Sequence, residues 1–457
     1  MNIDFSKYSK YSKPGPRYTS YPTAPEFSEA FTYKNYTDAI AVSNLNKRDV
    51  SLYFHLPFCR SACYFCGCNV IFTSKEDKKE RYIGYLKREL ALLAKHLDTS
   101  RPVTQMHFGG GTPTFFSAEQ LRVIIEAIKE TFPNFTSDAE ISCEVDPRYF
   151  NEDQMKLFSQ HGFNRISFGV QDFEPQVQEV VHRIQPFDMT LDCMNLARKY
   201  GVKSINVDLI YGLPFQTLES FKRTLELTLK LDPDRLAVFN YAHVPWMKKT
   251  MRKFDETTLP SPEVKLEIMQ EVIKFFTSHG YRMVGMDHFA KPEDELFAAI
   301  EKGELHRNFQ GYTTKGGADL FGVGITSIGE GELYYAQNHK ELELYEGAID
   351  ADKLPFYRGF QLSDDDKLRQ EVIMSLMSNF KLDIKKIERE WHINFNEYFG
   401  DAILALQSFV DEDLLTVNDS EIKASETGEL LIRNICMPFD AYLQKIPEDK
   451  RRFSKTV

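Results

Sequence analysis

Residues 51–69 read Ser-Leu-Tyr-Phe-His-Leu-Pro-Phe-Cys-Arg-Ser-Ala-Cys-Tyr-Phe-Cys-Gly-Cys-Asn. The apolar and aromatic run at 51–56 predicts a buried strand, and the loop that follows it carries four cysteines. From there on the sequence repeats one pattern, in which a short apolar run is followed by a turn and an amphipathic helical stretch. Such runs occur at 104–108, 139–144, 165–170, 204–210 and 235–241, and residues 281–286 are a candidate for a seventh. Alternation of this kind predicts parallel strands joined by helices.

Helical patterns separate the predicted strands, for example at 78–96, 117–131 and 217–229. Ser117 and Gln120 have the spacing of a capping box at the start of the second of these helices. About six strand–helix units would build either a barrel that does not quite close or an open doubly wound sheet. Periodicity alone does not distinguish the two. In both architectures we expect the reactive groups at the C-terminal ends of the strands, where the loops converge.

Composition excludes several classes of function. The chain has 457 residues, of which 42% are hydrophobic, so it can bury a sizeable core. Its length also exceeds that at which one core usually stops growing, so we expect a large domain and at least one smaller one. Its net charge of −11 argues against a nucleic-acid coat, because such a surface repels a polyanion. Its apolar runs are far shorter than the roughly 20 residues of a membrane span. The N-terminus lacks the apolar core of a secretory signal, so we expect a cytoplasmic protein.

The pattern changes after Phe289, which indicates a second domain. Residues 303–331 are irregular and rich in glycine, and a helical pattern follows at 363–380. Later short runs at 414–417, 422–424 and 430–432, with a turn at Asn418-Asp419, indicate a small hairpin beside helices. We therefore expect four parts: an N-terminal extension covering the site (1–43), an α/β core (44–290), a connecting segment at the substrate site (291–361), and a mostly helical, winged-helix-like domain (362–457).

The cysteines point to metal chemistry. Seven cysteines are too few for a disulfide framework in so long a chain, yet four of them lie within 59–68. Spacings of three and two residues between Cys59, Cys63 and Cys66 would let one loop bind three corners of a four-iron cluster. The fourth iron then has no protein ligand near in sequence. Such an open iron can bind the amino and carboxylate groups of an amino acid.

Three other interpretations of these cysteines remain open at this point. A structural zinc site would prefer paired C-x₂-C units or added histidines at fixed spacing. Cys68 could supply a fourth cluster ligand, although only one residue separates it from Cys66. The four thiols could also be unrelated buried residues. Cys143, Cys193 and Cys436 are interpreted as core thiols.

Further polar and glycine motifs follow the predicted strands. Gly109-Gly-Gly-Thr112 comes after the second strand and is either a place where a ligand approaches the backbone or a tight turn. Glu144 ends the third strand and would either bind ribose hydroxyls or cap a helix. Gln171, Arg183 and Asp208 follow on the same rim, where each is either a ligand contact or a polar contact of the barrel end.

The spacing C-x₃-C-x₂-C with Phe65 before the third cysteine resembles the signature of the radical S-adenosylmethionine superfamily. Longer strings resemble one family within it, the oxygen-independent coproporphyrinogen III oxidases, and this likeness covers nearly the whole chain. The strings lie at 16–23, 239–243, 308–314 and 433–437. The resemblance implies a partial (βα)6 TIM-like barrel with an N-terminal extension and a mostly helical C-terminal domain. It also implies that a 5′-deoxyadenosyl radical removes hydrogen from two propionates of coproporphyrinogen III, which lose carbon dioxide and become the vinyl groups of protoporphyrinogen IX.

The resemblance further implies a set of site residues. It assigns a [4Fe-4S] cluster to Cys59, Cys63 and Cys66. It places a first S-adenosylmethionine at Tyr53, Gly110, Glu144 and Ile328, and a second at Phe65, Gly111, Thr112, Gln171, Arg183, Asp208 and Ala242, with Ile210 close to both. From the same likeness we expect Tyr53, Glu144, Gln310 and Ile328 to act in catalysis.

The implied reaction sets requirements and has alternatives. A substrate with four carboxylates needs local cations in a protein of negative net charge, and Arg17 is our candidate. The reaction also needs an electron donor and an acceptor, which the sequence does not identify, and we expect a monomer.

A haem chaperone built on the same core is the main alternative, but Gly67, Cys68 and the segment at 16–22 argue against it. A cluster-bearing electron-transfer or regulatory protein would not need the glycine motif and Glu144.

Overall fold

The computed structural model describes residues 5–456. Contacts within the chain divide it into two units. The first, which we call the barrel unit, comprises Phe27–Ile268 and Gly317–Gln361. The second, the terminal unit, comprises the described residues up to Glu26, Met269–Gly316 and the described residues from Leu362 onward. Segments from both ends of the sequence therefore belong to the same unit.

The barrel unit contains a sheet whose middle strands are parallel. In the order β13, β1, β4, β5, β6, β7 and β8, each strand runs parallel to its neighbour. Their bounds are Asp319–Val323, Val50–Leu56, Val103–Gly110, Phe135–Val145, Arg165–Gln171, Ser204–Tyr211 and Arg235–Asn240. Antiparallel strands β14 (Ile328–Gly331), β15 (Tyr334–Asn338) and β16 (Phe356–Gln361) continue the sheet beyond β13. The six predicted parallel strands are confirmed, and β13 adds one that the sequence pattern did not indicate.

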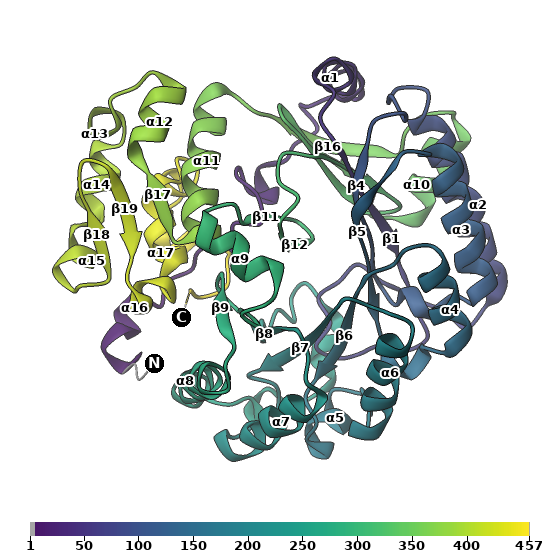
Figure 1. The fold of residues 1–457 in the computed structure, drawn as a ribbon, viewed down its shortest axis with the longest axis horizontal. Coiled ribbons are helices and arrows are strands. Elements are labelled where there is room, and N and C mark those ends of the chain that lie inside the picture. The colour runs from purple at the N-terminus through teal and green to yellow at the C-terminus, as the bar shows by residue number, and fades with distance from the viewer. Residues whose placement is uncertain (1–4, 457) are drawn as a thin grey trace. The chain divides into compact units, whose positions relative to one another are not determined.

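Helices connect these strands and lie along the outer side of the sheet, as Figure 1 shows for α2, α3, α4 and α6. The helices of this unit include α1 (Tyr33–Asn46), α2 (Glu76–Leu93), α3 (Ala118–Thr131), α4 (Glu152–Gln160), α5 (Pro175–Val180), α6 (Phe187–Lys199), α7 (Leu218–Leu231) and α10 (Leu342–Asp350). The predicted capping box at Ser117 and Gln120 begins α3. None of the helices within residues 5–456 has the length and apolarity that a membrane crossing requires.

Strand β1 shows how the sequence pattern positions the site. Successive side chains of a strand point to opposite faces of the sheet. Leu52, Phe54 and Leu56 are fully buried, and the Phe54 ring contacts the Phe108 ring of the neighbouring β4, with the centroids 5.6 Å apart. Tyr53 and His55 alternate with them and therefore occupy the opposite face. One face of β1 therefore packs in the core, and the other face carries the polar side chains of Tyr53 and His55.

The glycine-rich stretch at 303–331 is more regular than predicted. It contains β11 (His306–Asn308) and β12 (Gly311–Thr313), a hairpin in the terminal unit, and then β13 and β14 in the barrel unit. These strands are three to five residues long and contain several glycines, so they carry too little periodicity for a pattern to show. The candidate seventh run at 281–286 forms the short strand β9 (Arg282–Val284), which pairs antiparallel with β10 (His288–Ala290) rather than parallel.

The terminal unit is mostly helical. Its elements include α9 (Glu295–Lys302), α11 (Asp364–Asn379), α12 (Ile384–Trp391), α13 (Phe395–Tyr398), α14 (Gly400–Ala405), α15 (Gln407–Asp411), α16 (Glu426–Glu429) and α17 (Ile432–Cys436), while α8 (Pro262–Ser278) leads into it. The predicted helix at 363–380 is confirmed as α11. A small sheet has the order β17 (Lys381–Asp383), β19 (Glu421–Ala424), β18 (Leu415–Val417). The predicted hairpin is confirmed, because β18 and β19 pair antiparallel on either side of Asn418-Asp419. The buried run at 430–432 is not a strand and lies between the end of α16 and the first residue of α17.

Contacts within the terminal unit join the two ends of the chain. The buried guanidinium of Arg433 donates hydrogen bonds to the backbone oxygens of Gly15, Pro16 and Lys455. The Tyr18 hydroxyl, also buried, donates to Asp440 at 3.0 Å. These contacts fix the N-terminal segment against helices that lie more than 400 residues later. The four-part division of the chain drawn from the sequence stays a prediction.

A buried acid on α2 holds the loop after β13 in the barrel unit. Glu89 accepts hydrogen bonds from the Gly324 backbone N–H at 2.8 Å, the Asn338 side chain at 2.7 Å and the Tyr345 hydroxyl at 2.6 Å. Burial raises the pKa of Glu89 to about 7 despite these donors. Next to them the Tyr82 hydroxyl donates to the backbone oxygen of His55 at 2.9 Å. The network therefore fixes the end of β1, from which the cysteine loop begins.

We predict that Glu89→Leu destabilises the protein strongly. The substitution leaves the buried Gly324 N–H and Tyr345 hydroxyl without an acceptor, and each such group costs about 1–3 kcal/mol. The free energy of unfolding should fall by about 3 kcal/mol or more, measured by urea denaturation followed by circular dichroism. Lys87→Leu, at an exposed position of the same helix, is the matched control and should change little. Equal stability of the two variants would contradict this role of Glu89.

Candidate active site

A cavity of about 250 Å³ lies at the C-terminal ends of the parallel strands in the barrel unit. Most of the residues expected from the sequence to form a site line it together. They are Cys59, Cys63, Phe65, Cys66, Gly110, Gly111, Thr112, Glu144, Gln171, Arg183, Asp208 and Ile210. These side chains come from the ends of β1, β4, β5, β6 and β7 or from the loops that follow them. The structure thus brings together groups that lie up to about 150 residues apart in the sequence.

The cysteine loop is attached at both of its ends to the strands beneath it. The His55 ring, at the end of β1, is 2.9 Å from the backbone oxygen of Asn69, which closes the loop. Short strands β2 (Phe58–Cys59) and β3 (Ile71–Phe72) pair within it. The Cys59 sulfur lies 3.2 Å from the Thr112 hydroxyl of the glycine motif. The loop is therefore held in a fixed shape with its thiols facing the cavity.

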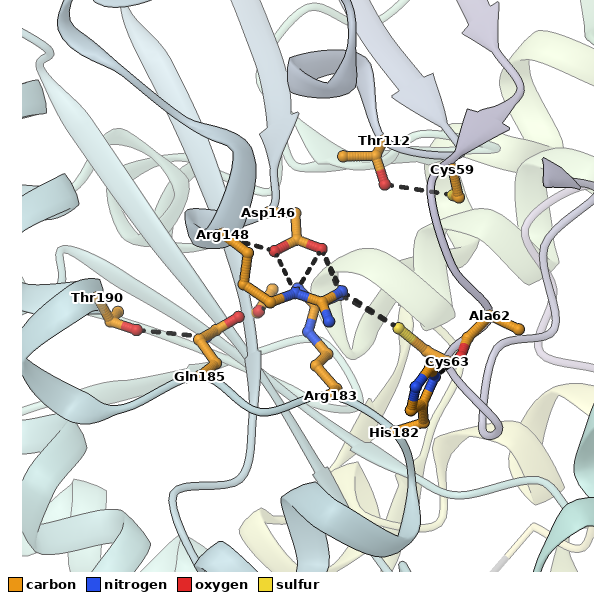
Figure 2. A network of polar contacts seen from close by, with 11 residues as sticks. Cys59, Ala62, Cys63, Thr112, Asp146, Arg148, His182, Arg183, Gln185 and Thr190 are labelled. Atoms are coloured by element: carbon orange, nitrogen blue, oxygen red, sulfur yellow. Dashed lines mark hydrogen bonds and ion pairs between the residues drawn. The ribbon is translucent and has the colours of Figure 1, made fainter. Parts of the chain in front are cut away.

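Two arginines donate hydrogen bonds to the sulfur of Cys63, as Figure 2 shows. The distances to this sulfur are 3.5 Å from Arg148 Nη2 and 3.6 Å from Arg183 Nη1. Asp146 holds both arginines, because it pairs with Arg148 at 2.7 Å and with Arg183 at 3.0 Å. Guanidinium donors of this kind can hydrogen-bond a cysteine sulfur that binds metal. The Arg148–Asp146–Arg183 group therefore fixes the position of the Cys63 sulfur at the edge of the cavity.

The thiols fit a cluster better than a single ion. Within the described residues, no group of three histidines, cysteines or acids could hold one metal ion. A four-iron cluster requires a different arrangement, because each thiolate binds a different iron. The sulfurs therefore stay farther apart than they do around a single ion. Cys59, Cys63 and Cys66 all line the same cavity from three positions along one loop. A hydrogen bond from Cys68 lowers the pKa of Cys66 to about 6, so the Cys66 side chain favours the thiolate.

The glycine motif lies so close to the first strand that side chains would not fit. A Cβ on Gly111 would come within 2.6 Å of the backbone of Pro57, and one on Gly110 within 2.7 Å of the His55 ring. Gly110 also has a φ of +111°, which disfavours other residues. The Gly111 and Thr112 N–H groups donate to the backbone of β1 and β2. The motif therefore both turns the chain and joins β4 to the cysteine loop.

Glu144 presents its carboxylate to the cavity beside this motif. It accepts a hydrogen bond from the Gly110 N–H at 3.2 Å, and the His107 ring lies 3.6 Å away. Burial alone would raise the pKa of Glu144, but His107 and the Gly110 N–H outweigh it and hold the pKa below its usual value. The group is thus an anion that can accept hydroxyl donors of a ligand.

Two further polar groups on β6 and β7 face the same cavity. Burial raises the pKa of Asp208 to about 6, while hydrogen bonds from Ser167 and Asn206 oppose that rise. The side-chain oxygen of Gln171 is buried and has no hydrogen-bond partner. Arg183 likewise has a buried Nε without a partner. Unpaired buried polar atoms in a cavity are the groups that a polar ligand would satisfy.

Four of the expected site residues do not line this cavity. Tyr53 lies on β1, where its ring stacks on His107. Ile328 begins β14, and its backbone lies against Gly322, the residue that pairs with Tyr53 in β13. Ala242 is exposed in the segment after β8, and Gln310 belongs to the terminal unit. Their assigned roles stay predictions.

Sequence reasoning missed Arg148, Asp146 and His107 as parts of the site. The string Asp146-Pro147-Arg148 follows Glu144 directly, so its position after a strand end was a usable signal. His107 alternates with the buried Met106 and Phe108 of β4, which places it on the same face as Tyr53. No pattern, however, could show that Arg148 reaches the sulfur of a cysteine 85 residues away.

Comparison with known proteins agrees with this geometry. Residues 53–228 match the radical SAM superfamily, and residues 362–431 match the HemN C-terminal domain. Oxygen-independent coproporphyrinogen III oxidase of Helicobacter pylori strain J99 is 57% identical, and the alignment covers 100% of both chains. The protein of that name from Escherichia coli K12 is 46% identical over 100% of this chain and 99% of its own length.

A solved structure shows the same likeness in three dimensions. Coproporphyrinogen III oxidase (HemN) from Escherichia coli, described as a radical SAM enzyme, superposes with a TM-score of 0.92 at 45% identity. The match covers 97% of this chain and 100% of that one. This likeness confirms the predicted fold class and makes the chain an oxidoreductase with a [4Fe-4S] cluster and S-adenosylmethionine as cofactors. The chain therefore belongs to the oxygen-independent coproporphyrinogen III oxidase family of the radical SAM superfamily.

Proposed function

We propose that this chain decarboxylates two propionate side chains of coproporphyrinogen III to vinyl groups without oxygen, giving protoporphyrinogen IX. The observation that carries the proposal is the cavity in which three thiols, a glycine motif, an anionic Glu144 and a buried Arg183 meet. The family membership of the whole chain supports the same reaction. A haem chaperone is the competing outcome, and the comparisons do not favour it.

The chain's own residues would bind, orient and shield the reacting groups. When bound, the cluster and S-adenosylmethionine supply a carbon radical that removes a hydrogen atom from the substrate. Cys59, Cys63 and Cys66 would hold the cluster, while Arg148 and Arg183 donate hydrogen bonds to the Cys63 sulfur. Walls that exclude water protect a reactive radical from side reactions.

Two sets of residues would hold two molecules of S-adenosylmethionine. Tyr53, Gly110, Glu144 and Ile328 form the first set, and the Glu144 carboxylate accepts ribose hydroxyls there. Phe65, Gly111, Thr112, Gln171, Arg183, Asp208 and Ala242 form the second, with Ile210 close to both. The unpaired donor of Arg183 and acceptor of Gln171 support a polar ligand at the second set. Tyr53, Glu144, Gln310 and Ile328 are the residues that we propose to act in catalysis.

The proposal also includes the compartment, the oligomeric state and the redox partners of the protein. All seven cysteines are free thiols, which suits a cytoplasmic protein in a reducing compartment. We propose a monomer that takes electrons from a separate donor, passes them to a separate acceptor and binds no nucleic acid. Oligomeric state is checked by light scattering of the reconstituted protein.

We predict that Cys68 is not a cluster ligand. Its side chain is exposed, and only one residue separates it from Cys66, so the two would not reach two irons of one cluster. Cys68→Ala should therefore keep nearly all of the iron after anaerobic reconstitution, whereas Cys63→Ala should lose most of it. Iron and sulfide are counted per chain in both variants. Equal losses would make Cys68 a fourth ligand.

We predict that Asp208→Asn weakens the second S-adenosylmethionine only. Asp208 lies on β7 and has no contact with a cluster cysteine among its hydrogen bonds. Equilibrium dialysis of the reconstituted enzyme should find about two molecules bound per wild-type chain and about one in the variant, with unchanged iron. Asp188→Asn, at an exposed position of α6, is the control. One molecule per wild-type chain would reject the two-cofactor proposal.

One anaerobic assay tests the reaction itself. Reconstituted enzyme receives reductant, S-adenosylmethionine and coproporphyrinogen III, and 5′-deoxyadenosine and vinyl products are counted. We expect about one deoxyadenosine for each vinyl group, because each hydrogen abstraction uses one radical. Cys63→Ala should form neither product. Tight haem binding without any protoporphyrinogen IX would favour the chaperone instead.

A further inference from the structure

The terminal unit contains a group of charged and polar residues outside the proposed cluster and cofactor sites, and one of them, Gln310, is also a proposed catalytic residue. Arg17 lies in the N-terminal segment between Pro16 and Tyr18. Asp287 lies in the turn between β9 and β10, and Arg307 lies on β11. Arg433 lies on α17, and Gln310 lies in the turn that joins β11 to β12. We call these five residues the arginine group. They come from segments far apart in the sequence that all belong to this one unit.

The arginine group has more cations than its acid can neutralise. Arg17 Nη1 pairs with Asp287 Oδ2 at 2.9 Å. Burial would raise the pKa of Asp287, but Arg17, His288, Arg307 and Arg433 together hold it below its usual value. The positive charges of three guanidinium groups thus act on one carboxylate, and only Arg17 pairs with it directly. Their mutual repulsion in a partly buried place favours the binding of a further anion.

Several hydrogen-bonding atoms of this group are buried without partners. Nε and Nη1 of Arg307 make no hydrogen bond, and the same holds for both polar atoms of the Gln310 amide. The Arg307 guanidinium lies over the Tyr312 ring, 4.5 Å from its centroid, which fixes its plane. Buried donors normally have acceptors, and a charged donor without one is especially costly. These donors are therefore available to a ligand that accepts hydrogen bonds.

The other two arginines, Arg433 and Arg17, differ from Arg307 in their contacts. Arg433 donates to the backbone oxygens of Gly15, Pro16 and Lys455, so its donors are engaged. By holding Pro16 it positions the neighbouring Arg17, and its charge adds to the local field. Arg17 is about one third exposed and is held in place by Asp287. Arg307 is thus the residue whose unpaired donors a ligand would meet, while Arg17 supports it.

We propose that Arg307, supported by Arg17 and Gln310, binds a carboxylate group of a small molecule. A planar carboxylate is the anion that matches guanidinium N–H donors, and the Gln310 amide adds both a donor and an acceptor. Resting on the proposed function, we assign this carboxylate to a propionate of coproporphyrinogen III. The assignment extends our sequence-based candidate Arg17 to a site with defined residues.

The chemistry further indicates a propionate that is retained in the product. Loss of carbon dioxide turns a carboxylate into a neutral molecule, so the reacting group gives up its negative charge. A guanidinium that stabilises the carboxylate opposes this change, because it favours the charged ground state over the path to the neutral product. An arginine site therefore suits a carboxylate that anchors the substrate and does not react.

The test compares coproporphyrin III, which has four free carboxylates, with its tetramethyl ester. Both are titrated into the reconstituted full-length enzyme with S-adenosylmethionine, and binding is followed by porphyrin fluorescence. We expect Arg307→Met to bind the tetra-acid about tenfold or more weakly than the wild type and to bind the ester unchanged. Arg307→Lys should recover part of the lost affinity, because it restores charge without the planar fork.

Controls separate this inference from folding and from the proposed function. Arg389→Met, at an exposed position of α12, should bind like the wild type. If Arg307→Met does not fold, Arg17→Met and Arg307→Lys take its place with the same expectation of weaker tetra-acid binding. In the assay, the Arg307 variants should raise KM for coproporphyrinogen III, while the deoxyadenosine formed per vinyl group stays the same.

The outcomes that overturn the inference are distinct from those that overturn the function. Wild-type formation of protoporphyrinogen IX together with unchanged tetra-acid affinity in every Arg307 variant would reject the carboxylate site and leave the function intact. An equal loss of affinity for the ester would also reject it, because the effect would then not depend on carboxylates. A wild type that forms no vinyl product rejects the proposed function and the substrate assignment with it.

Discussion

Parallel pairing of β13, β1, β4, β5, β6, β7 and β8 is the constraint on which the rest of the structure depends. Parallel strands deliver all of their following loops to one edge of a sheet. The cysteine loop after β1, the glycine motif after β4 and Glu144 at the end of β5 meet for this reason. The alternation of side chains along β1 supports it, since the core face takes the aliphatic residues and the other face takes Tyr53 and His55.

Close backbone contacts then fix the geometry at that edge. Gly111 can approach Pro57 only because it lacks a Cβ, and the contact joins the glycine motif to the strand that begins the cysteine loop. His55 closes the same loop at Asn69, and the buried Glu89 network holds the end of β1 from behind. A cluster loop held in this way loses little conformational freedom when it binds metal, because its thiols already face one cavity.

Electrostatics explain how an acidic protein handles anionic ligands. The chain has a net charge of −11, yet arginines gather at two places, each within one unit. In the barrel unit, Asp146 holds Arg148 and Arg183 against the Cys63 sulfur. In the terminal unit, Asp287 holds Arg17 within a group that also contains the unpaired donors of Arg307. In both places an acid positions cations without cancelling them, so that cationic donors remain available to another group.

The sequence by itself determined what lies within one strand end or one loop. The spacing of Cys59, Cys63 and Cys66 and the order of the six strand–helix units are local patterns, and both could be predicted. The short strand β13 could not, because five residues that include a glycine carry too little periodicity. Only the tertiary structure decided which distant groups meet, such as Arg148 with Cys63. The physical reason is that hydrogen bonds and ion pairs depend on distance in space, which a folded backbone sets and a linear pattern does not record.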